Sequence, residues 1–173
     1  PPVPEELVPS DSPEKDAEGD MELAPLRILL VEDNPINQTV ITEYLKSNDH
    51  DVLVCDNAVE ALHHLAQEVF DAVLMDVSLP GMSGVECTER IREGDDPNID
   101  ANVPIVAITA HAFDGDRERF LAAGMNDYVT KPVHFQRLSA ALWRVTRGRS
   151  RPGEALPPLQ ANQPEILTER PAS

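Results

Sequence analysis

Three acidic residues, a threonine and a lysine each stand at the end of a short apolar run in this sequence. They are Glu32, Asp33, Asp76, Thr109 and Lys131. Three carboxylates held within a few ångströms of one another repel, and one takes up a proton unless a cation lies between them. A hard divalent cation such as Mg²⁺ (or Mn²⁺) suits this set, because it takes oxygen ligands, keeps part of its water and accepts a phosphate.

Together with such a cation, these residue types could transfer a phosphoryl group. An aspartate beside Mg²⁺ can attack phosphorus and form an acyl phosphate. A lysine offers a positive charge, and a threonine a hydroxyl donor, to the outer oxygens of the transferred group. The five residues therefore predict a site in which one aspartate is the nucleophile.

The five residues meet only if the apolar runs form neighbouring parallel strands. Continuous apolar strands that alternate with helices are typical of a parallel sheet buried on both faces. The site of such a sheet lies beyond the carboxyl ends of its strands. We therefore predict an α/β fold, a doubly wound (βα)₅ domain. The expected strands are 27–31, 52–55, 72–75, 104–109 and 128–130, and the expected helices are 35–48, 58–66, 85–92, 116–123 and 134–146.

Several helix ends are marked by residues that satisfy free backbone groups. Asn34 followed by Pro35 is typical of an N-cap with proline at the first helical position. Asn57, with Glu60 three residues later, predicts a capping box at the second helix. Gly124 is expected to end the helix 116–123 in the left-handed conformation.

Charge and proline content divide the chain into three parts. Residues 1–25 hold eight acidic residues, one lysine and six prolines, which predicts an acidic, proline-rich linker. Residues 147–173 hold five prolines and predict a flexible C-terminal tail. Neither end has enough apolar residues to fold alone. Residues 26–146 are therefore predicted to form the single domain.

The composition argues against several classes of protein. A net charge of −17 disfavours nucleic acid as a partner, because a phosphate backbone requires a basic surface. No apolar run approaches the roughly 18 residues that cross a membrane, so we expect no direct membrane contact. Cys55 and Cys87 are too few for a disulfide framework or a usual zinc site. They are expected to be buried thiols in a reducing, cytoplasmic compartment.

Four segments in order resemble a known family. They are 31–38 (VEDNPINQ), 75–84 (MDVSLPGMSG), 108–112 (ITAHA) and 127–132 (DYVTKP). From about residue 27 to 143, the chain is similar to the receiver domain of two-component response regulators, and most similar to receivers attached to hybrid sensor histidine kinases. The resemblance implies a flavodoxin-like sheet with strand order 2-1-3-4-5.

The resemblance also implies a role for each residue of the metal site. Asp76 matches the phosphoacceptor, and Asp33 matches the direct Mg²⁺ ligand. Glu32 matches the acidic residue that holds a metal-bound water, a position where many relatives have aspartate. Ser78 matches the residue whose backbone carbonyl binds the metal.

Three further residues match the positions that respond to the phosphate. Thr109 matches the switch hydroxyl and Lys131 the lysine that binds the phosphate. Tyr128 matches the aromatic residue whose rotamer reports activation, although an ordinary core tyrosine explains it too. The Lys131–Pro132 bond matches one that is usually cis in the family.

The implied function is phosphorelay signalling, in which Asp76 takes a phosphoryl group from a phosphohistidine. The start at proline and the short tail suggest the C-terminal module of a hybrid kinase, with a histidine kinase domain in cis. The implied next partner is a histidine phosphotransfer domain, and the isolated receiver is expected to be monomeric. Residues expected to dock that partner are Ile36, Asn37, Pro132, Val133 and Phe135, although Ile36 is equally compatible with an ordinary surface residue.

Two alternatives stay open. The chain could be a free single-domain response regulator with the same chemistry. It could also be an aspartate-nucleophile phosphatase of the haloacid-dehalogenase kind, which uses the same residue types. That family places Asp-x-Asp after its first strand, where this chain has Glu32, Asp33 and Asn34.

Overall fold

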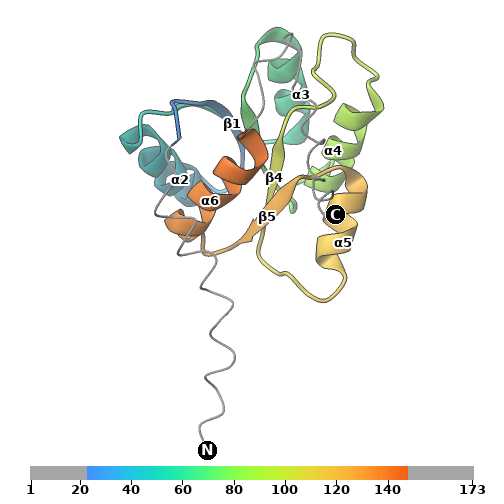
Figure 1. The fold of residues 1–173 in the computed structure, drawn as a ribbon. Coiled ribbons are helices and arrows are strands. Elements are labelled where there is room, and N and C mark those ends of the chain that lie inside the picture. The colour runs from blue at the N-terminus through green and yellow to red at the C-terminus, as the bar shows by residue number, and fades with distance from the viewer. Residues whose placement is uncertain (1–22, 148–173) are drawn as a thin grey trace, which may run out of the picture.

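A computed structural model describes residues 23–147, which fold around one parallel sheet (Figure 1). Within these residues the sheet has five strands in the order β2-β1-β3-β4-β5, which confirms the predicted topology. The strands are β1 (Arg27–Val31), β2 (Asp51–Cys55), β3 (Ala72–Asp76), β4 (Ile105–Thr109) and β5 (Asp127–Thr130).

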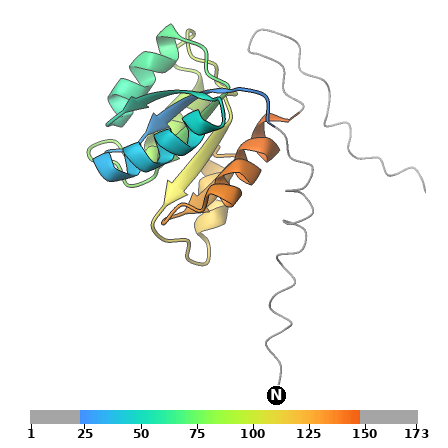
Figure 2. The ribbon, with the colours of Figure 1, turned by 90° about the vertical axis from the view of Figure 1, so that its left-hand side faces the viewer.

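The helices lie on both faces of the sheet, as a doubly wound fold requires (Figures 1 and 2). They are α2 (Pro35–Ser47), α3 (Ala58–Gln67), α4 (Gly84–Glu93), α5 (Asp116–Ala123) and α6 (Phe135–Thr146). Helices α2 and α6 pack on one face, and α3, α4 and α5 pack on the other. Every expected helix is therefore present, with ends within one or two residues of the prediction.

Alternate residues of each central strand pack into the two halves of the core. In β1, Leu29 packs toward α3, α4 and α5, whereas Ile28 and Leu30 pack toward α2 and α6. All residues of β3 and β4 are buried. Burial on both faces explains why these strands read as continuous apolar runs rather than alternating ones.

The helix caps confirm most of the predicted ends and correct one. The side chain of Asn57 accepts the N–H of Glu60, but the Glu60 carboxylate accepts from Asp56 N–H (3.5 Å), one residue before the cap. The reciprocal capping box predicted at α3 is therefore incomplete. A complete box is present at α4, where Ser83 and Glu86 satisfy each other's backbone N–H.

The N-terminal end of the described chain contacts the core. Leu23, which the sequence assigned to the linker, packs with Leu26 against the α2 and α6 side. His50, buried in the turn before β2, accepts the Leu26 N–H through Nδ1 (3.0 Å). Linker positions 1–22 and the tail from 148 onward lie outside the described residues.

Two composition-based expectations can be checked in the fold. Cys55 and Cys87 are buried free thiols, and burial raises the pKa of each to about 12. This confirms the prediction that both thiols are buried. Among residues 23–147, no helix is both long enough and apolar enough to cross a membrane.

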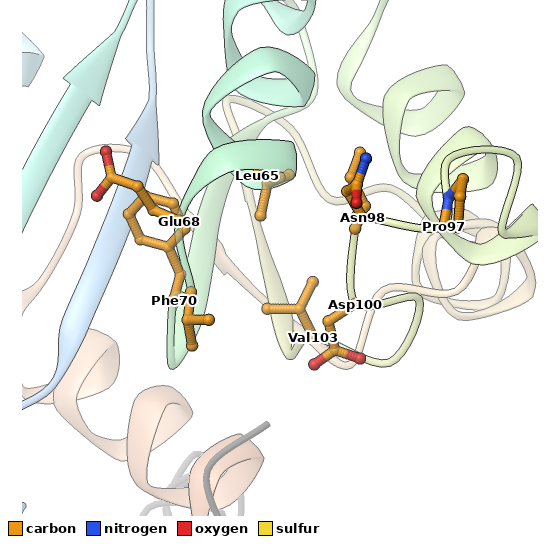
Figure 3. Close-up of a pocket in the computed structure, with 9 residues that line it drawn as sticks. Leu65, Glu68, Phe70, Pro97, Asn98, Asp100 and Val103 are labelled. Atoms are coloured by element: carbon orange, nitrogen blue, oxygen red, sulfur yellow. The ribbon is translucent and has the colours of Figure 1, made fainter. Parts of the chain in front are cut away.

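A cavity of about 380 Å³ opens at the amino end of the sheet, between the end of α3 and the loop before β4 (Figure 3). Its apolar lining includes Leu65, Phe70 and Val103, and its rim includes Glu68 and Asp100. None of the predicted site residues lines it. It therefore lies apart from the polar residues at the carboxyl end of the strands.

Candidate functional site

The parallel register brings the predicted site residues to one edge of the sheet. Val31 of β1 pairs with Met75 of β3, so the next residues along the two strands, Glu32 and Asp76, lie side by side. Thr109 pairs with Thr130, and the Lys131 N–H donates to the Thr109 carbonyl (2.8 Å). Because all five strands point the same way, residues far apart in sequence reach the same edge.

An acidic cluster forms at this edge, with a lysine beside it. Glu32, Asp33 and Asp76 each place a carboxylate oxygen within 4.8 Å of the other two. Lys131 Nζ lies 3.1 Å from Asp76 Oδ2 and 3.3 Å from Glu32 Oε1. Glu32 and Asp76 are buried, whereas Asp33 is exposed. The structure thus brings together four of the five residues with which the sequence analysis began.

Burial and neighbouring charges set the protonation of this cluster. Burial raises the pKa of Glu32, and the charge of Asp76 raises it further, while the Asn34 N–H, Lys131 and Asn37 oppose the rise. Burial alone would lower the pKa of Lys131. The hydrogen bond and charge of Asp76, together with the charge of Glu32, outweigh burial and raise it. The lysine is therefore held as a cation between two carboxylates.

The donor set fits a hard divalent cation. Within the described chain, Glu32 Oε1 is a buried oxygen with no hydrogen-bond partner, and Lys131 Nζ is near it without hydrogen-bond geometry. Such an oxygen is costly unless a ligand or water satisfies it. Three carboxylates at this spacing are the oxygen ligands that Mg²⁺ takes, and the exposed Asp33 leaves an open side for its water.

The hydrogen bonds of Thr109 and Ser78 reach residues only two positions away in the sequence. The Thr109 hydroxyl donates to the His111 carbonyl (2.6 Å) and accepts the His111 N–H (3.1 Å). This hydroxyl is thus engaged within its own loop rather than with Asp76. The Ser78 N–H donates to Asp76 Oδ1 (2.9 Å), so the residue expected to supply a carbonyl also orients the Asp76 carboxylate.

Tyr128 and the Lys131–Pro132 bond stand on the last strand and just beyond it. The Tyr128 ring is half-buried and lies 5.9 Å from the Phe120 ring, centroid to centroid. It packs against the part of the core under α3, α4 and α5. The Lys131–Pro132 bond is cis, as the resemblance implies.

The residues expected to dock a partner fall into two groups. Ile36 is 72% exposed, and Phe135 and Pro132 are also exposed. Val133 is partly buried and packs toward the core. The Asn37 amide points inward and donates to Glu32 Oε2 (3.3 Å). Of the docking set, Asn37 is thus the member whose polar group lies within the acidic site.

The surface around Ile36 also contains features that the sequence analysis did not identify. Val40, one helical turn after Ile36, is 45% exposed, and its i, i+4 spacing from Ile36 was the available signal. Phe135 stacks on Tyr44 with ring centroids 4.1 Å apart. The Tyr44 hydroxyl is hydrogen-bonded to Ser139, so α2 and α6 present one joined surface.

Gln38 is a further residue that sequence reasoning missed. Its amide donates to the Glu32 carbonyl (2.6 Å) and to Asp56 Oδ1 (2.9 Å). A polar residue in the first turns of a helix is usually solvated, so its type alone did not single it out. Its place in the segment 31–38 was the only sequence signal.

Comparison with known proteins gives matches over the same part of the chain. Residues 28–143 match the family model described as the response regulator receiver domain. The sensor histidine kinase GacS of Pseudomonas protegens is 40% identical over 146 residues, which make up 84% of this chain and 15% of that kinase. The chain therefore spans well under two thirds of the length of this relative.

Two solved structures extend the comparison. One is the receiver domain of the sensor histidine kinase PA1611 from Pseudomonas aeruginosa, solved with a magnesium ion coordinated in its active site cleft. It is 42% identical with a TM-score of 0.63, and the match covers 71% of this chain and 98% of that one. The other match is a chain from the co-crystal structure of the Saccharomyces cerevisiae histidine phosphotransfer signaling protein Ypd1 and the receiver domain of its downstream response regulator Ssk1. It is 32% identical with a TM-score of 0.66, and covers 72% of this chain and 92% of that one.

Proposed function

This chain belongs to the response regulator receiver domain family, and from that premise we propose that its Asp76 accepts a phosphoryl group from a phosphohistidine. The observation that carries the proposal is the convergence of Glu32, Asp33 and Asp76 around one point, with Lys131 Nζ 3.1 Å from Asp76. The aspartate-nucleophile phosphatase is not favoured, because the family match covers nearly the whole described domain.

The transfer exchanges one bond to phosphorus for another. A carboxylate oxygen of Asp76 bonds to phosphorus while the phosphorus–nitrogen bond of the phosphohistidine breaks. The electron pair of that bond returns to the imidazole nitrogen. Lys131, already beside Asp76 Oδ2, then neutralises an outer oxygen of the transferred group. Burial of Asp76 limits the access of water to the acyl phosphate.

The acidic cluster would hold the divalent cation that this chemistry needs. Asp33, Asp76 and the Ser78 carbonyl are the proposed direct ligands, and Glu32 would hold a metal-bound water. When bound, Mg²⁺ (or Mn²⁺) neutralises charge that develops on the phosphoryl oxygens. Support comes from the exposed carboxylate of Asp33 and from the magnesium in the cleft of the PA1611 receiver.

Thr109 and Tyr128 would convert phosphorylation into a change of surface. To reach the phosphate, the Thr109 hydroxyl must give up its bond to the His111 carbonyl. Tyr128 would then move from its place against Phe120 into the space that Thr109 leaves. Phosphorylation thereby favours one of two arrangements of the β4 and β5 ends, which is a shift of population.

We further propose that the receiver is a module of a hybrid sensor histidine kinase, with the kinase domain in cis. The similarity to GacS supports this assignment over a free single-domain regulator. The cytoplasm is the proposed location, on the cytoplasmic side of the membrane if the parent kinase is membrane-anchored, because a phosphorelay draws on ATP. The isolated receiver is proposed to be monomeric.

A histidine phosphotransfer domain is the proposed next partner. The exposed surface around Ile36, Pro132 and Phe135 would receive it, with Val133 beneath. This surface adjoins the acidic cluster, because α2 follows Asp33 and α6 follows Lys131 by only a few residues. The Ypd1–Ssk1 co-crystal structure supports the choice of partner class.

Labelling with acetyl phosphate tests the central assignment. The full chain, incubated with acetyl phosphate and Mg²⁺, is expected to gain one phosphoryl group by intact-mass spectrometry. Asp76→Asn is expected to abolish the gain, whereas Asp95→Asn, a change in the exposed loop after α4, keeps it. Equal labelling of Asp76→Asn and the wild type would refute the assignment.

A further inference from the structure

Two amide side chains at the start of α2 reach back to Glu32. Asn37 Nδ2 lies 3.3 Å from Glu32 Oε2, and Gln38 Nε2 lies 2.6 Å from the Glu32 carbonyl. One amide therefore holds the carboxylate and the other holds the backbone of the same residue. Both contacts go to Glu32, which is a member of the acidic cluster.

The Asn37 contact makes the two oxygens of the Glu32 carboxylate unequal. Oε2 accepts from Asn37 and also from the Asn34 N–H (3.1 Å). Oε1, in contrast, is buried and has no hydrogen-bond partner in the described chain. The oxygen without a partner is the one that lies 3.3 Å from Lys131 Nζ, on the side of the acidic cluster. Two donors on Oε2 thus keep Oε1 turned toward the place where a ligand would bind.

The Gln38 contact fixes where the chain leaves the sheet. The Glu32 N–H still follows the strand ladder and donates to the Cys55 carbonyl (3.1 Å). Its carbonyl lies beyond the last residue of β1, where Gln38 caps it. The same amide donates to Asp56 Oδ1 (2.9 Å), just after β2. Gln38 therefore ties together the ends of β1 and β2 next to the acidic cluster.

We propose that Asn37 and Gln38 are positioning residues, which hold Glu32 so that its Oε1 faces the bound divalent cation. This inference rests on the proposed function, because it needs a cation in the acidic cluster. It assigns Asn37 a role inside the site rather than the docking role expected from the sequence. The glutamate makes such positioning necessary, since its side chain has one more rotatable bond than aspartate.

Loss of the Asn37 amide removes one of the two donors on Oε2 and leaves the Glu32 carboxylate freer to turn. Oε1 would then face the proposed cation for less of the time. Changes in groups that orient metal ligands typically weaken metal binding by about 10–100-fold. Because the Asn34 N–H still holds Oε2, we expect the lower end of that range for Asn37→Ala, about tenfold.

Isothermal titration of the unphosphorylated full chain with Mg²⁺ tests this inference without relying on phosphorylation. Asn37→Ala and the similar-sized Asn37→Leu are both expected to weaken Mg²⁺ binding about tenfold, and Gln38→Ala is expected to weaken it about threefold. Gln67→Ala, an exposed amide at the end of α3, is the matched control and is expected to bind as the wild type does. Urea unfolding of each variant checks that the fold is retained.

Repeating the Asn37→Ala change in a Glu32→Gln variant distinguishes the loss of positioning from general damage to the fold. In Glu32→Gln, the Asn37→Ala change is expected to cost less than about twofold in Mg²⁺ affinity, because the two changes act through one contact. Equal losses in both backgrounds would overturn the inference, as would wild-type Mg²⁺ affinity in Asn37→Ala and Asn37→Leu. If instead the wild type neither binds Mg²⁺ nor labels on Asp76, the proposed function fails, and this inference fails with it.

Discussion

At the carboxyl end of the sheet, Glu32 and Asp76 are buried beside Lys131, whereas at the amino end Arg27 holds Asp51 and Glu68 in partly exposed ion pairs. The same strands therefore end in two different electrostatic environments. Removing one partner from a buried pair leaves a costly charge. Exposed pairs contribute about 1 kcal/mol or less each. The carboxyl end bears the larger electrostatic cost, and it is where the proposed chemistry occurs.

Apolar packing and a second arginine, Arg92, also hold the amino end. Phe70 and Val103 line the cavity there, beneath the loop before β4 (Figure 3). Arg92 of α4 donates to the Ala101 carbonyl of that loop and to the Gly124 carbonyl after α5, both at 2.8 Å. These contacts fix loops to the core. From this comparison we expect changes at the amino end to alter stability alone, and changes at the carboxyl end to alter phosphorylation as well.

The largest expected effect is on stability and comes from the amino end. Phe70→Ala removes a large side chain that is 2% exposed, and such changes cost about 3–5 kcal/mol of unfolding free energy. Urea unfolding measures the loss, with the exposed Val69→Ala as the control. The folded fraction of Phe70→Ala should still label at the wild-type rate with acetyl phosphate. If the folded fraction of Phe70→Ala labels more slowly than the wild type, the proposed division between the two ends is wrong.

The next effect is on phosphorylation and comes from the carboxyl end. Lys131→Met keeps the length of the side chain but removes the charge beside Asp76. Loss of one group that stabilises developing charge typically costs about 10²–10³-fold in rate, so we expect acetyl phosphate labelling to slow at least about 100-fold. Lys46→Met, in the last turn of α2, serves as the control. Near-normal labelling of Lys131→Met would remove the lysine from the proposed mechanism.

A third prediction separates docking from chemistry within the carboxyl end. Changing Ile36 and Phe135 together to serine removes exposed apolar surface without changing charge. Transfer from a phosphorylated histidine phosphotransfer domain is expected to slow about tenfold, because buried apolar area of this size contributes on the order of 1–2 kcal/mol. Acetyl phosphate labelling should stay the same. Val69→Ser, an exposed apolar change at the amino end, should alter neither rate, and equal loss of both rates in the double variant would contradict a docking surface.

The smallest predicted effect is a pH dependence of opposite sign at the two ends. Burial raises the pKa of Glu32, so its contribution to stability is present below its unfolded pKa and is lost as pH rises through the folded one. Burial lowers the pKa of His50, so its contribution is present above its unfolded pKa and is lost as pH falls through the folded one.

Urea unfolding in EDTA at a series of pH values measures these two contributions. The stability of Glu32→Gln relative to the wild type should increase as pH rises from about 4.5, near the ordinary pKa of a glutamate. The stability of the wild type relative to His50→Asn should decrease as pH falls below about 6.5, near the ordinary pKa of a histidine. With both differences taken as wild type minus variant, the value for Glu32→Gln should fall and the value for His50→Asn should rise as pH increases. Changes in the same direction would show that the two buried groups do not differ in the proposed way.

The sequence by itself determined the order of the elements and the edge at which the polar residues gather. Apolar runs such as 72–75, alternating with helices, are typical of strands buried on both faces, and a parallel sheet sends their carboxyl ends to one side. That is why the residue order alone was enough to place Asp76, Asp33 and Lys131 together. The helix ends at Asn34 and Gly124 could also be predicted, because capping depends on residue types close to each end in the sequence.

Only the tertiary structure decided where individual polar atoms point. The Asn37 amide turns toward Glu32, and the Thr109 hydroxyl turns toward the His111 carbonyl; residue types alone specify neither direction. Likewise, Arg92 reaches the Ala101 carbonyl in the loop that follows α4 and the Gly124 carbonyl after α5. Such orientations depend on which donors and acceptors surround a side chain after packing. Periodicity and spacing report backbone shape and burial, and therefore carry no information about these contacts.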